Sequence, residues 1–280
     1  MNEQIANNIA MNRVAIDLGF MQIYWYSIII LVAIFAGVTI VYLEAKKQKM
    51  NLDDFTDLFF CTVIYGLIGA RIYYVLFNLS YYLSNKLEIF EVWNGGLAIH
   101  GGIIGGLLYV IYFSKKRKYN FLKLLDMMVV GLIIAQSIGR WGNFFNQEAY
   151  GPVVSLEQLQ KDMIPNFIIE RMKILGQYHE PTFYYESLWN LNGFIILMTL
   201  RRFKKLEIGT LTGVYCIYYS IGRLYIESLR MDSLMLGNFK VAQIVSIILI
   251  LLGTFLIIRP KIFKKSELYN NTQNTKRKEI

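Results

Sequence analysis

Three long runs of the chain contain no charged residue, apart from a possible charge on His100. They cover Leu18 to Leu43, Val92 to Ser114 and Val241 to Ile258. A helix needs roughly 20 mostly apolar residues to cross the hydrocarbon core of a bilayer, and each run is close to that length or longer. The runs therefore predict three membrane-spanning helices.

Four weaker runs are apolar but are interrupted by charged side chains. They cover about Phe55 to Phe77, Phe121 to Gly139, Phe183 to Leu200 and Ile208 to Ser228. The chain has 280 residues, of which 55% are hydrophobic and 18% are charged. Its mean hydropathy of +0.39 is too high for an ordinary soluble domain. We predict an all-α, polytopic membrane protein with seven transmembrane helices.

Basic residues alternate between the predicted loops. They follow the first, third, fifth and seventh helices, at Lys46 to Lys49, Lys115 to Lys118, Arg201 to Lys205 and from Arg259 onward. Because Lys and Arg concentrate in cytoplasmic loops, the N-terminus is predicted outside and the C-terminus in the cytoplasm. The net charge is +9. Since its excess lies in these segments, anionic lipid of the inner leaflet is the expected partner, and nucleic acid is not.

The chain is treated as a single integral membrane domain over residues 1–280, because it shows no internal repeat or low-complexity linker. One long insertion, at about residues 150–181, separates the fourth and fifth predicted helices and is expected to form a small extracytoplasmic cap. Residues 259–280 are expected to form a basic cytoplasmic tail. With two histidines and no metal-ligand spacing, the sequence predicts neither a metal ion nor a cofactor.

The run GRWGNFFNQEAYG, residues 139–151, places polar side chains at the end of an apolar segment. These are Arg140, Asn143, Asn146 and Glu148. Polar and charged groups are costly at membrane depth, and where they occur they usually mark a functional site. We interpret this run as part of a binding or catalytic site.

Further polar groups lie in two other predicted spans. His100 stands among six glycines in WNGGLAIHGGIIGG, which fits either a closely packed helix or a site that a ligand approaches. Arg223, Glu227 and Arg230 are spaced four and then three residues apart, so they are predicted to share one helical face. Taken alone, the first spacing equally fits an internal Arg223–Glu227 ion pair without function.

The alternating directions of the predicted helices bring several cationic groups into the outer half of the bilayer. These groups are Arg140, Arg223, Arg230 and His100. Arginine binds phosphate through a planar, bidentate fork and stays charged when partly buried. An anion that is reached from within the bilayer is most simply a phospholipid head group. The sequence therefore predicts a lipid substrate.

Four further motifs accompany the 139–151 run. They are YWY at 24–26, WNGGLAIHGG at 93–102, EPTFYYES at 180–187 and IGRLYIESLR at 221–230. Together with that run, they resemble the motifs of the bacterial prolipoprotein diacylglyceryl transferase family in order and approximate spacing. Many family members have histidine directly before the proline of EPTFYYES, where this chain has Glu180 and carries His179 one place earlier. The resemblance covers nearly the whole chain.

The resemblance implies an enzyme that transfers the diacylglyceryl group of phosphatidylglycerol to the lipobox cysteine of a prolipoprotein signal peptide. A thioether forms and glycerol phosphate is released, as the first step of lipoprotein maturation at the bacterial cytoplasmic membrane. By the same resemblance, Arg140 and Arg223 bind the lipid phosphate and contribute to catalysis. The other implied site residues are Tyr26, His100, Asn143, Asn146, Glu148, Gly151, Glu227 and Arg230.

The thiol in such a reaction must become a thiolate before it attacks carbon, and its ordinary pKa is about 8.5. Histidine, with an ordinary pKa of about 6.5, can assist as a general base, which makes His100 one candidate. A carboxylate such as Glu148, or a water molecule, is another candidate. In that case His100 would hold the lipid head group.

Two other classes of protein fit parts of the sequence. A lipid or anion transporter would use the intramembrane arginines to bind cargo without chemistry, although the inverted repeats common in transporters are not apparent here. A structural scaffold would use the polar groups to hold helices together. Formation of a diacylglyceryl adduct on a cysteine peptide separates the enzyme from both.

Overall fold

The computed structural model describes residues 13–19, 21–230, 235–237, 239–263 and 267–271. Within these residues, the helices that are long and apolar enough to cross a membrane are α2 (Trp25–Lys47), α3 (Leu52–Phe77), α6 (Phe121–Asn146) and α11 (Val241–Phe263). Three other long helices are α5 (Ile99–Lys116), α9 (Thr182–Leu200) and α10 (Thr210–Leu229). The fold is that of a helical, polytopic membrane protein. Each predicted segment coincides with one of these helices.

The start of α2 differs from the prediction. The apolar run begins at Leu18, but α2 begins only at Trp25. The residues before it form an antiparallel hairpin of β1 (Val14–Asp17) and β2 (Gln22–Tyr24). An apolar run alone does not distinguish such a strand from the first turns of a helix.

The start of α5 is also later than predicted, at Ile99 rather than Val92. Gly95 and Gly96 adopt left-handed φ angles of +86° and +69°, which a helix does not contain. The chain before α5 therefore turns instead of continuing the helix, and the glycines permit this turn.

α6 and α11 extend well beyond their predicted ends. α6 continues beyond Gly139 to Asn146, so most of the polar 139–151 run is helical. α11 continues beyond Ile258 to Phe263. Polar and basic residues in these last turns ended the apolar runs before the helices themselves end.

The remaining elements are short. They are α4 (Leu79–Ser84), the 3-10 helices η1 (Lys86–Phe90) and η2 (Val92–Asn94), α7 (Leu156–Lys161), α8 (Asn166–Arg171), and the hairpins β3 (Lys173–Ile174) with β4 (Gln177–Tyr178) and β5 (Met235–Leu236) with β6 (Phe239–Lys240). The all-α prediction describes the long elements and misses the hairpins.

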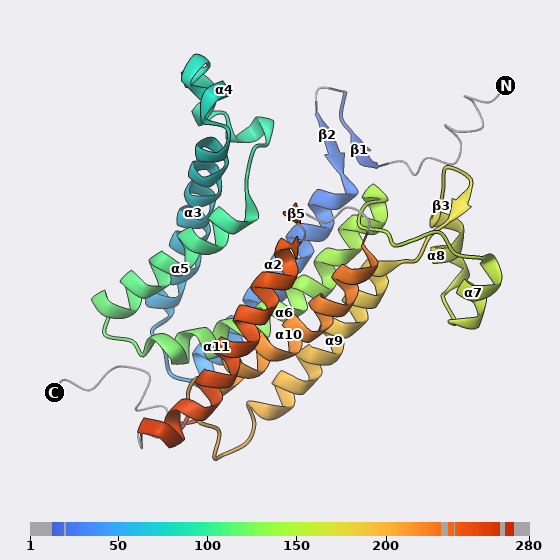
Figure 1. The fold of residues 1–280 in the computed structure, drawn as a ribbon. Coiled ribbons are helices and arrows are strands. Elements are labelled where there is room, and N and C mark those ends of the chain that lie inside the picture. Colours follow the sequence, from blue (N-terminus) through green and yellow to red (C-terminus); the bar gives the residue numbers. More distant parts are fainter. Residues whose placement is uncertain (1–12, 20, 231–234, 238, 264–266, 272–280) are drawn as a thin grey trace.

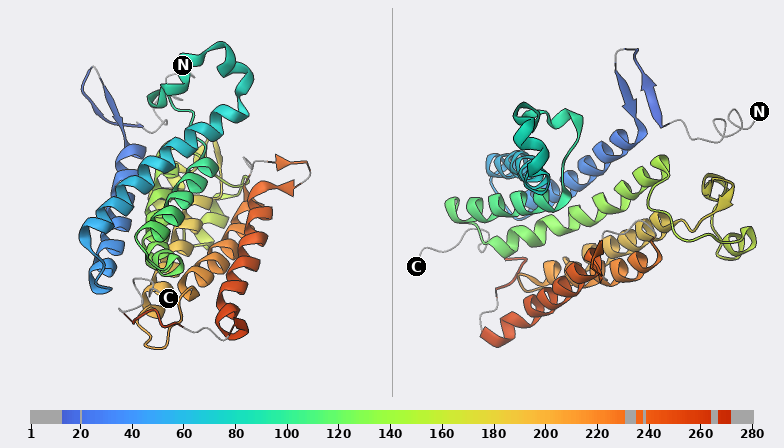
Figure 2. Two further views of the ribbon diagram at one scale, coloured as in Figure 1. Left: turned by 90° about the vertical axis from the view of Figure 1, so that its left-hand side faces the viewer. Right: turned by 45° about the horizontal axis from the view of Figure 1, so that its top comes forward.

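The long helices pack largely as pairs (Figures 1 and 2). α2 lies along α6, α3 along α5 and α10 along α11, while α9 contacts both α6 and α10. The α3–α5 pair leans away from the other long helices in Figure 1 and approaches them near the turn between α5 and α6. There, Phe113 and Tyr119 join a hydrophobic core that includes Leu124 and Val130 of α6.

Paired glycines let two of these helix pairs approach closely. Between α2 and α6, a Cβ atom on Gly131 would lie 2.5 Å from the carbonyl oxygen of Gly37. Between α10 and α11, a Cβ atom on Gly253 would lie 2.6 Å from the carbonyl oxygen of Gly213. A side chain at these crossings would push the backbones apart, so small residues set the helix spacing.

The 150–181 insertion belongs to a compact segment between α6 and α9. The side chains of Leu159, Ile168 and Met172 are buried against Phe144 of α6 and Phe183 of α9. The insertion is thus a folded unit with its own small apolar core. Its packing holds the end of α6 beside the start of α9.

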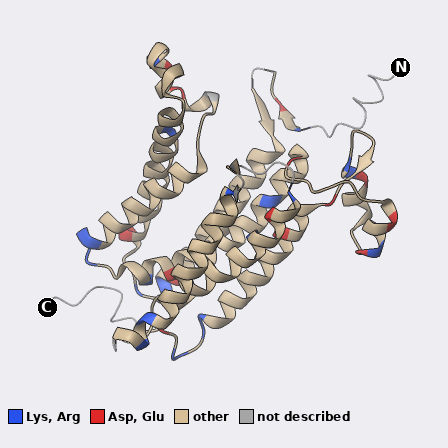
Figure 3. Ribbon diagram, viewed as in Figure 1, with Lys and Arg blue, Asp and Glu red and all other residues tan. Residues whose placement is uncertain are grey.

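Lys and Arg gather at the opposite end of the long helices, at the ends of α5 and α11 and after α9 (Figure 3). Residues 267–271 fold back onto this end. Tyr269 is fully buried, and its hydroxyl donates to Glu44 Oε1 at 2.9 Å. Lys123 Nζ donates to the carbonyl oxygen of Asn271 at 2.8 Å. The described part of the tail is therefore a packed element of the basic end.

Candidate active site

The final turns of α6 carry the start of the polar 139–151 run. The helix begins at Phe121 because the side chain of Asn120 accepts a hydrogen bond from the backbone N–H of Lys123. It ends at Asn146, and the next residue, Gln147, has a left-handed φ of +52°. Arg140 thus lies on the helix, whereas Glu148 lies beyond it.

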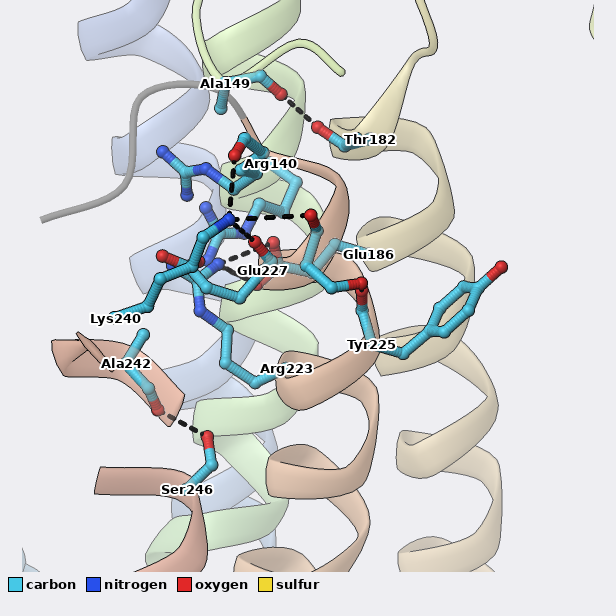
Figure 4. Close-up of polar contacts among 12 residues, drawn as sticks. Arg140, Ala149, Thr182, Glu186, Arg223, Tyr225, Glu227, Lys240, Ala242 and Ser246 are labelled. Atoms are coloured by element: carbon cyan, nitrogen blue, oxygen red, sulfur yellow. Dashed lines mark hydrogen bonds and ion pairs between the residues drawn. The ribbon is translucent and has the colours of Figure 1, made fainter. Parts of the chain in front are cut away.

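Two arginines from different helices converge on one buried carboxylate (Figure 4). Arg140 Nη2 of α6 forms an ion pair with Glu186 Oε1 of α9, and Arg223 Nη1 of α10 lies 3.1 Å from Glu186 Oε2. The Glu186 side chain is 5% exposed, against 21% for Arg140 and 15% for Arg223. The carboxylate is therefore enclosed, while each arginine keeps part of its side chain accessible to a ligand.

Arg223 also forms an ion pair within its own helix. Its Nη2 atom lies 2.6 Å from Glu227 Oε2, one turn later, and the Glu227 side chain is 3% exposed. This is the internal ion pair that the spacing allowed. Because Arg223 contacts Glu186 at the same time, the pair is part of a larger cluster that links α6, α9 and α10.

Arg230 does not share the helical face predicted for it. It follows the last residue of α10 and has extended backbone angles, φ −75° and ψ 137°. Its carbonyl oxygen accepts a hydrogen bond from Lys240 Nζ at 3.0 Å, and the carbonyl oxygen of Glu227 accepts another from the same group at 2.6 Å. Lys240 directly precedes α11, so it ties the start of α11 to the end of α10 beside the cluster (Figure 4).

Hydrogen bonds between α6 and α9 support the cluster from one side. Trp141 Nε1 donates to Ser187 Oγ at 3.1 Å, and Ser137 Oγ donates to the carbonyl oxygen of Ser187 at 2.8 Å. Trp141 and Ser187 are the sequence neighbours of Arg140 and Glu186. These bonds therefore fix the two helices next to the charged side chains.

Tyr26 of α2 packs on the same end of α6. A Cβ atom on Gly142 would lie 2.8 Å from the Tyr26 ring, so the ring rests directly on the backbone there, and Tyr26 is 40% exposed. The carbonyl oxygen of Asn143 accepts a hydrogen bond from the backbone N–H of Gln147 at the end of the helix. The carbonyl oxygen of Asn146 accepts a hydrogen bond from Arg13 Nη2 at 2.9 Å. Asn143 and Asn146 thus belong to the end of α6 that presents Arg140, and Tyr26 packs against it from α2.

Glu148 and Gly151 lie in the turn that leads away from α6. Glu148 is exposed. The N–H of Gly151 donates to the carbonyl oxygen of Glu180 at 2.8 Å, and a Cβ atom there would lie 2.9 Å from Glu180 Cβ. His179 Nδ1 lies 3.0 Å from the Gly151 carbonyl oxygen. The close packing of Gly151 against Glu180 explains why a glycine stands at position 151. Burial raises the pKa of the Glu180 carboxyl, and the negative charge of Asp162 adds to this shift.

His100 lies on a different helix pair from the arginines. It is exposed on the first turn of α5, and its ring centre lies 6.0 Å from that of Tyr73 in α3. The structure joins Arg140, Arg223 and Glu227 in one cluster with Glu186 and places His100 beside Tyr73 on the α3–α5 pair.

Most of the chain matches one protein family. A family model described as prolipoprotein diacylglyceryl transferase matches residues 13–259. The chain belongs to this family. The phosphatidylglycerol–prolipoprotein diacylglyceryl transferases of Staphylococcus aureus strains MSSA476 and MW2 are each 46% identical to it over 258 residues. The protein of the same name from strain JH9 is 45% identical over 258 residues, and each of these alignments covers 92% of both chains.

One residue of the cluster, Glu186, was not predicted from the sequence as a site residue of this family member. It lies in the EPTFYYES motif at 180–187 and is the charge that interrupts the predicted span from Phe183 to Leu200. An acidic side chain within a span needs a partner, and Arg140 and Arg223 were the cations at comparable positions of other spans. The signal was present, but the pairing depends on how three helices pack.

The charges of the cluster are balanced before any ligand binds. Arg140 and Arg223 contact Glu186, and Arg223 also contacts Glu227. Arginine uses the same planar fork for carboxylate and phosphate. The glutamates hold the arginines in a partly desolvated, oriented state in which they can stabilise negative charge that grows on an oxyanion.

Proposed function

We propose that this protein transfers the diacylglyceryl group of phosphatidylglycerol to the lipobox cysteine of a prolipoprotein signal peptide. The product is a thioether, glycerol phosphate is released, and the reaction is the first step of lipoprotein maturation. The observation that carries the proposal is the convergence of Arg140 and Arg223 on one buried carboxylate from two helices. The names of the relatives supply the two substrates.

The reaction exchanges one bond for another at a glycerol carbon. The thiolate sulfur attacks the carbon that carries the phosphate ester, the C–S bond forms, and the C–O bond breaks. The electron pair leaves with glycerol phosphate, so negative charge increases on the phosphate oxygens. Arg140 and Arg223 bind this phosphate and stabilise the transition state more than the ground state. Further substrate contacts come from Tyr26, Asn143, Asn146, Gly151, Glu227 and Arg230.

The proton of the thiol passes to a general base. His100 takes this role in our proposal, with Glu148 or a water molecule as the alternative. His100 lies on the α3–α5 pair, and the arginines lie on α6 and α10. A lipid head group that contacts His100 and the arginines at once therefore has to lie between these two groups of helices. The peptide cysteine then approaches from the His100 side.

The proposed setting is the bacterial cytoplasmic membrane. All of the long helices span it, seven in total, with the N-terminus and the compact 150–181 segment outside and the basic end with the 259–280 tail in the cytoplasm. The arginine cluster then lies toward the outer leaflet. This orientation places the cluster at the depth of phospholipid head groups on the side where signal peptides emerge.

Mass measurement tests the proposed reaction. The full chain, reconstituted in phosphatidylglycerol vesicles, is incubated with a peptide that carries a lipobox cysteine. We expect a diacylglyceryl adduct on the peptide together with free glycerol phosphate. Movement of lipid across the bilayer without an adduct would contradict the proposal and favour a transporter.

The Arg140→Ala substitution tests the phosphate assignment in the same assay. We expect loss of the adduct, because the growing negative charge loses one of its two cationic partners, while the protein remains in the membrane. Arg117→Ala is the matched control, since Arg117 pairs with Asp57 at 2.9 Å on the α3–α5 pair and is 47% exposed. Full activity of Arg140→Ala would remove the phosphate-binding role.

A further inference from the structure

Arg71 is a buried cation that the proposed reaction does not use. It lies in α3, six residues before the end of the helix, and is 7% exposed. Among the residues that the structure describes, it forms no ion pair. A charged group in an apolar helix is costly unless other groups satisfy it, so its partners require an explanation.

The guanidinium of Arg71 is satisfied by backbone carbonyl oxygens of the loop before α5. Nε donates to Ile89 at 2.9 Å, and Nη1 donates to Gly95 at 2.9 Å and to Gly96 at 3.0 Å. Nη2 donates to the carbonyl oxygen of Glu88. Arginine has five N–H donors in a rigid fork, and four of them are used here on two separate stretches of one loop.

The loop is shaped to receive this side chain. A Cβ atom on Gly96 would lie 2.4 Å from Arg71 Nη1, so only glycine lets the carbonyl group approach. Gly95 and Gly96 both have left-handed φ angles, which turns their carbonyl groups toward α3. The ring of Tyr82 covers the guanidinium at 5.2 Å. Lysine has one charged nitrogen and no fork, so it cannot make the same set of bonds.

The residues next to Arg71 fix the start of α5. The carbonyl oxygen of Ala70 accepts the backbone N–H of Ala98 at 3.1 Å. A Cβ atom on Gly101 would lie 2.3 Å from the carbonyl oxygen of Gly69, so the two helices are in backbone contact there. His100 lies between these two attachment points, beside Tyr73.

We infer that Arg71 is a positioning residue for His100. By binding the loop over residues 88–96, it sets where α5 begins and therefore where the His100 ring stands relative to the substrate. The inference rests on the proposed function for the role of His100. The placement of the ring can be measured without it.

The first test follows the chemical reactivity of His100. The full-length wild type and the Arg71→Lys variant are treated with diethyl pyrocarbonate in detergent, and the modification of His100 is timed by peptide mass spectrometry. We expect the modification rate of His100 to change several-fold in Arg71→Lys, because the freed loop no longer holds the exposed ring beside Tyr73, with an unchanged rate at His179. Equal rates at His100 in both proteins would overturn the inference.

The second test is a double-mutant cycle on diacylglyceryl transfer. Arg71→Lys is expected to lower kcat roughly 10- to 100-fold with little change in KM for phosphatidylglycerol, as a displaced catalytic group does. In a His100→Gln background, the same substitution should lower the residual rate no further. A full additional loss in that background would show that Arg71 does not act through His100.

Tyr81→Phe is the matched control for both tests. It removes the hydroxyl that donates to Glu88 Oε2 at 2.8 Å in the same loop and leaves the carbonyl contacts of Arg71 intact. We expect the wild-type modification rate of His100 and the wild-type kcat. Changes in these two quantities as large as those of Arg71→Lys would overturn the inference. A wild type that responds as expected to the reagent but forms no adduct would refute the proposed function and leave the positioning role standing.

Discussion

Arg71 and the two arginines of the cluster are satisfied in two chemically different ways. Arg71 donates to backbone carbonyl oxygens, which cannot move independently of the loop. Arg140 and Arg223 contact the carboxylate of Glu186, a side chain on a neighbouring helix. A carbonyl cage is a fixed structural contact, whereas a carboxylate can be partly replaced by a phosphate of the same charge sign. At the scale of single residues, this difference separates the structural arginine from the proposed ligand-binding ones.

The Glu186→Gln substitution tests whether the carboxylate orients the two arginines. We expect kcat for diacylglyceryl transfer to fall roughly 10- to 100-fold, because both guanidinium groups lose their common charged anchor. KM for phosphatidylglycerol should change less, since removal of a competing carboxylate offsets the poorer orientation. Initial rates over a range of phosphatidylglycerol content in mixed vesicles measure both parameters.

Glu88→Gln provides the control for this substitution. The Glu88 carboxylate accepts a hydrogen bond from the exposed hydroxyl of Tyr81, and neither residue belongs to the arginine cluster. The Glu88→Gln variant should retain the wild-type kcat. The thermal unfolding midpoint in detergent is recorded for each variant, so that a folding defect is recognised. A correctly folded Glu186→Gln protein with wild-type kcat would show that the arginines need no such anchor.

Helix positions could be predicted from the sequence where local apolar character decides them. α9 begins at Thr182 and ends at Leu200, within a residue of the predicted span. The start of α5 could not be predicted, because Gly95 is turned by contacts to Arg71, 24 residues earlier in the chain. The start of α2 differs for a local reason, because Gln22–Tyr24 of the predicted first turns pair with Val14–Asp17 in a hairpin. Long-range contact overrides the local pattern at α5, and local strand pairing does so at α2.

The Gly131→Ala substitution tests the close crossing of α2 and α6. A Cβ atom there would lie 2.5 Å from the carbonyl oxygen of Gly37 and 2.5 Å from a methyl group of Val41. Because the backbone cannot yield as a flexible side chain does, we expect a destabilisation of about 1–3 kcal/mol. The thermal unfolding midpoint in detergent should fall accordingly.

Gly139→Ala is the matched control on the same helix and facing the same partner. Its new Cβ atom would meet only the end of the Ile30 side chain, at 3.6 Å, which is an ordinary contact. Since alanine favours helix over glycine by about 1 kcal/mol, this variant should be as stable as the wild type or more so. Equal midpoints for both alanine variants would contradict the account of the crossing.

At the scale of the whole molecule, the described tail closes the basic end of the helices. Tyr269 reaches Glu44 of α2, and Asn271 meets Lys123 of α6, although more than 100 residues separate each pair. The sequence predicted the arginines of the site from the cost of burying charge, but this tail contact and the pairing of Glu186 with both arginines could not be predicted from it. Both depend on which segments the assembled helices bring together.

The Tyr269→Phe substitution tests whether the tail stabilises the bundle. Loss of the hydroxyl leaves the buried Glu44 carboxylate with one fewer donor, which should cost about 1–3 kcal/mol of unfolding free energy. Burial, with the charge of Glu44, raises the pKa of Tyr269 above its ordinary value of 10.0. The contribution is therefore complete at neutral pH and declines only as the pH rises above 10. Unfolding midpoints should differ at pH 7 and approach each other above pH 10; a difference that does not change with pH would contradict this account.

The orientation of the whole molecule can be tested with two exposed positions at opposite ends. Leu175 is 99% exposed in the compact segment between α6 and α9, and Lys204 is exposed in the basic turn after α9. Single cysteines are placed at either position in a background that lacks Cys61 and Cys216. Because basic loops are retained in the cytoplasm, a membrane-impermeant maleimide should label Leu175→Cys in intact cells and Lys204→Cys only after permeabilisation.

The two positions lie at opposite ends of one helix, so their labelling patterns have to be opposite if α9 crosses the bilayer. Labelling of both in intact cells would mean that α9 does not span, and the number of transmembrane helices would then be smaller than seven. Exclusive labelling of Lys204→Cys would reverse the orientation and place the arginine cluster at the inner leaflet. A lipobox cysteine would then have to be modified before export, which would contradict the proposed approach of the signal peptide from outside.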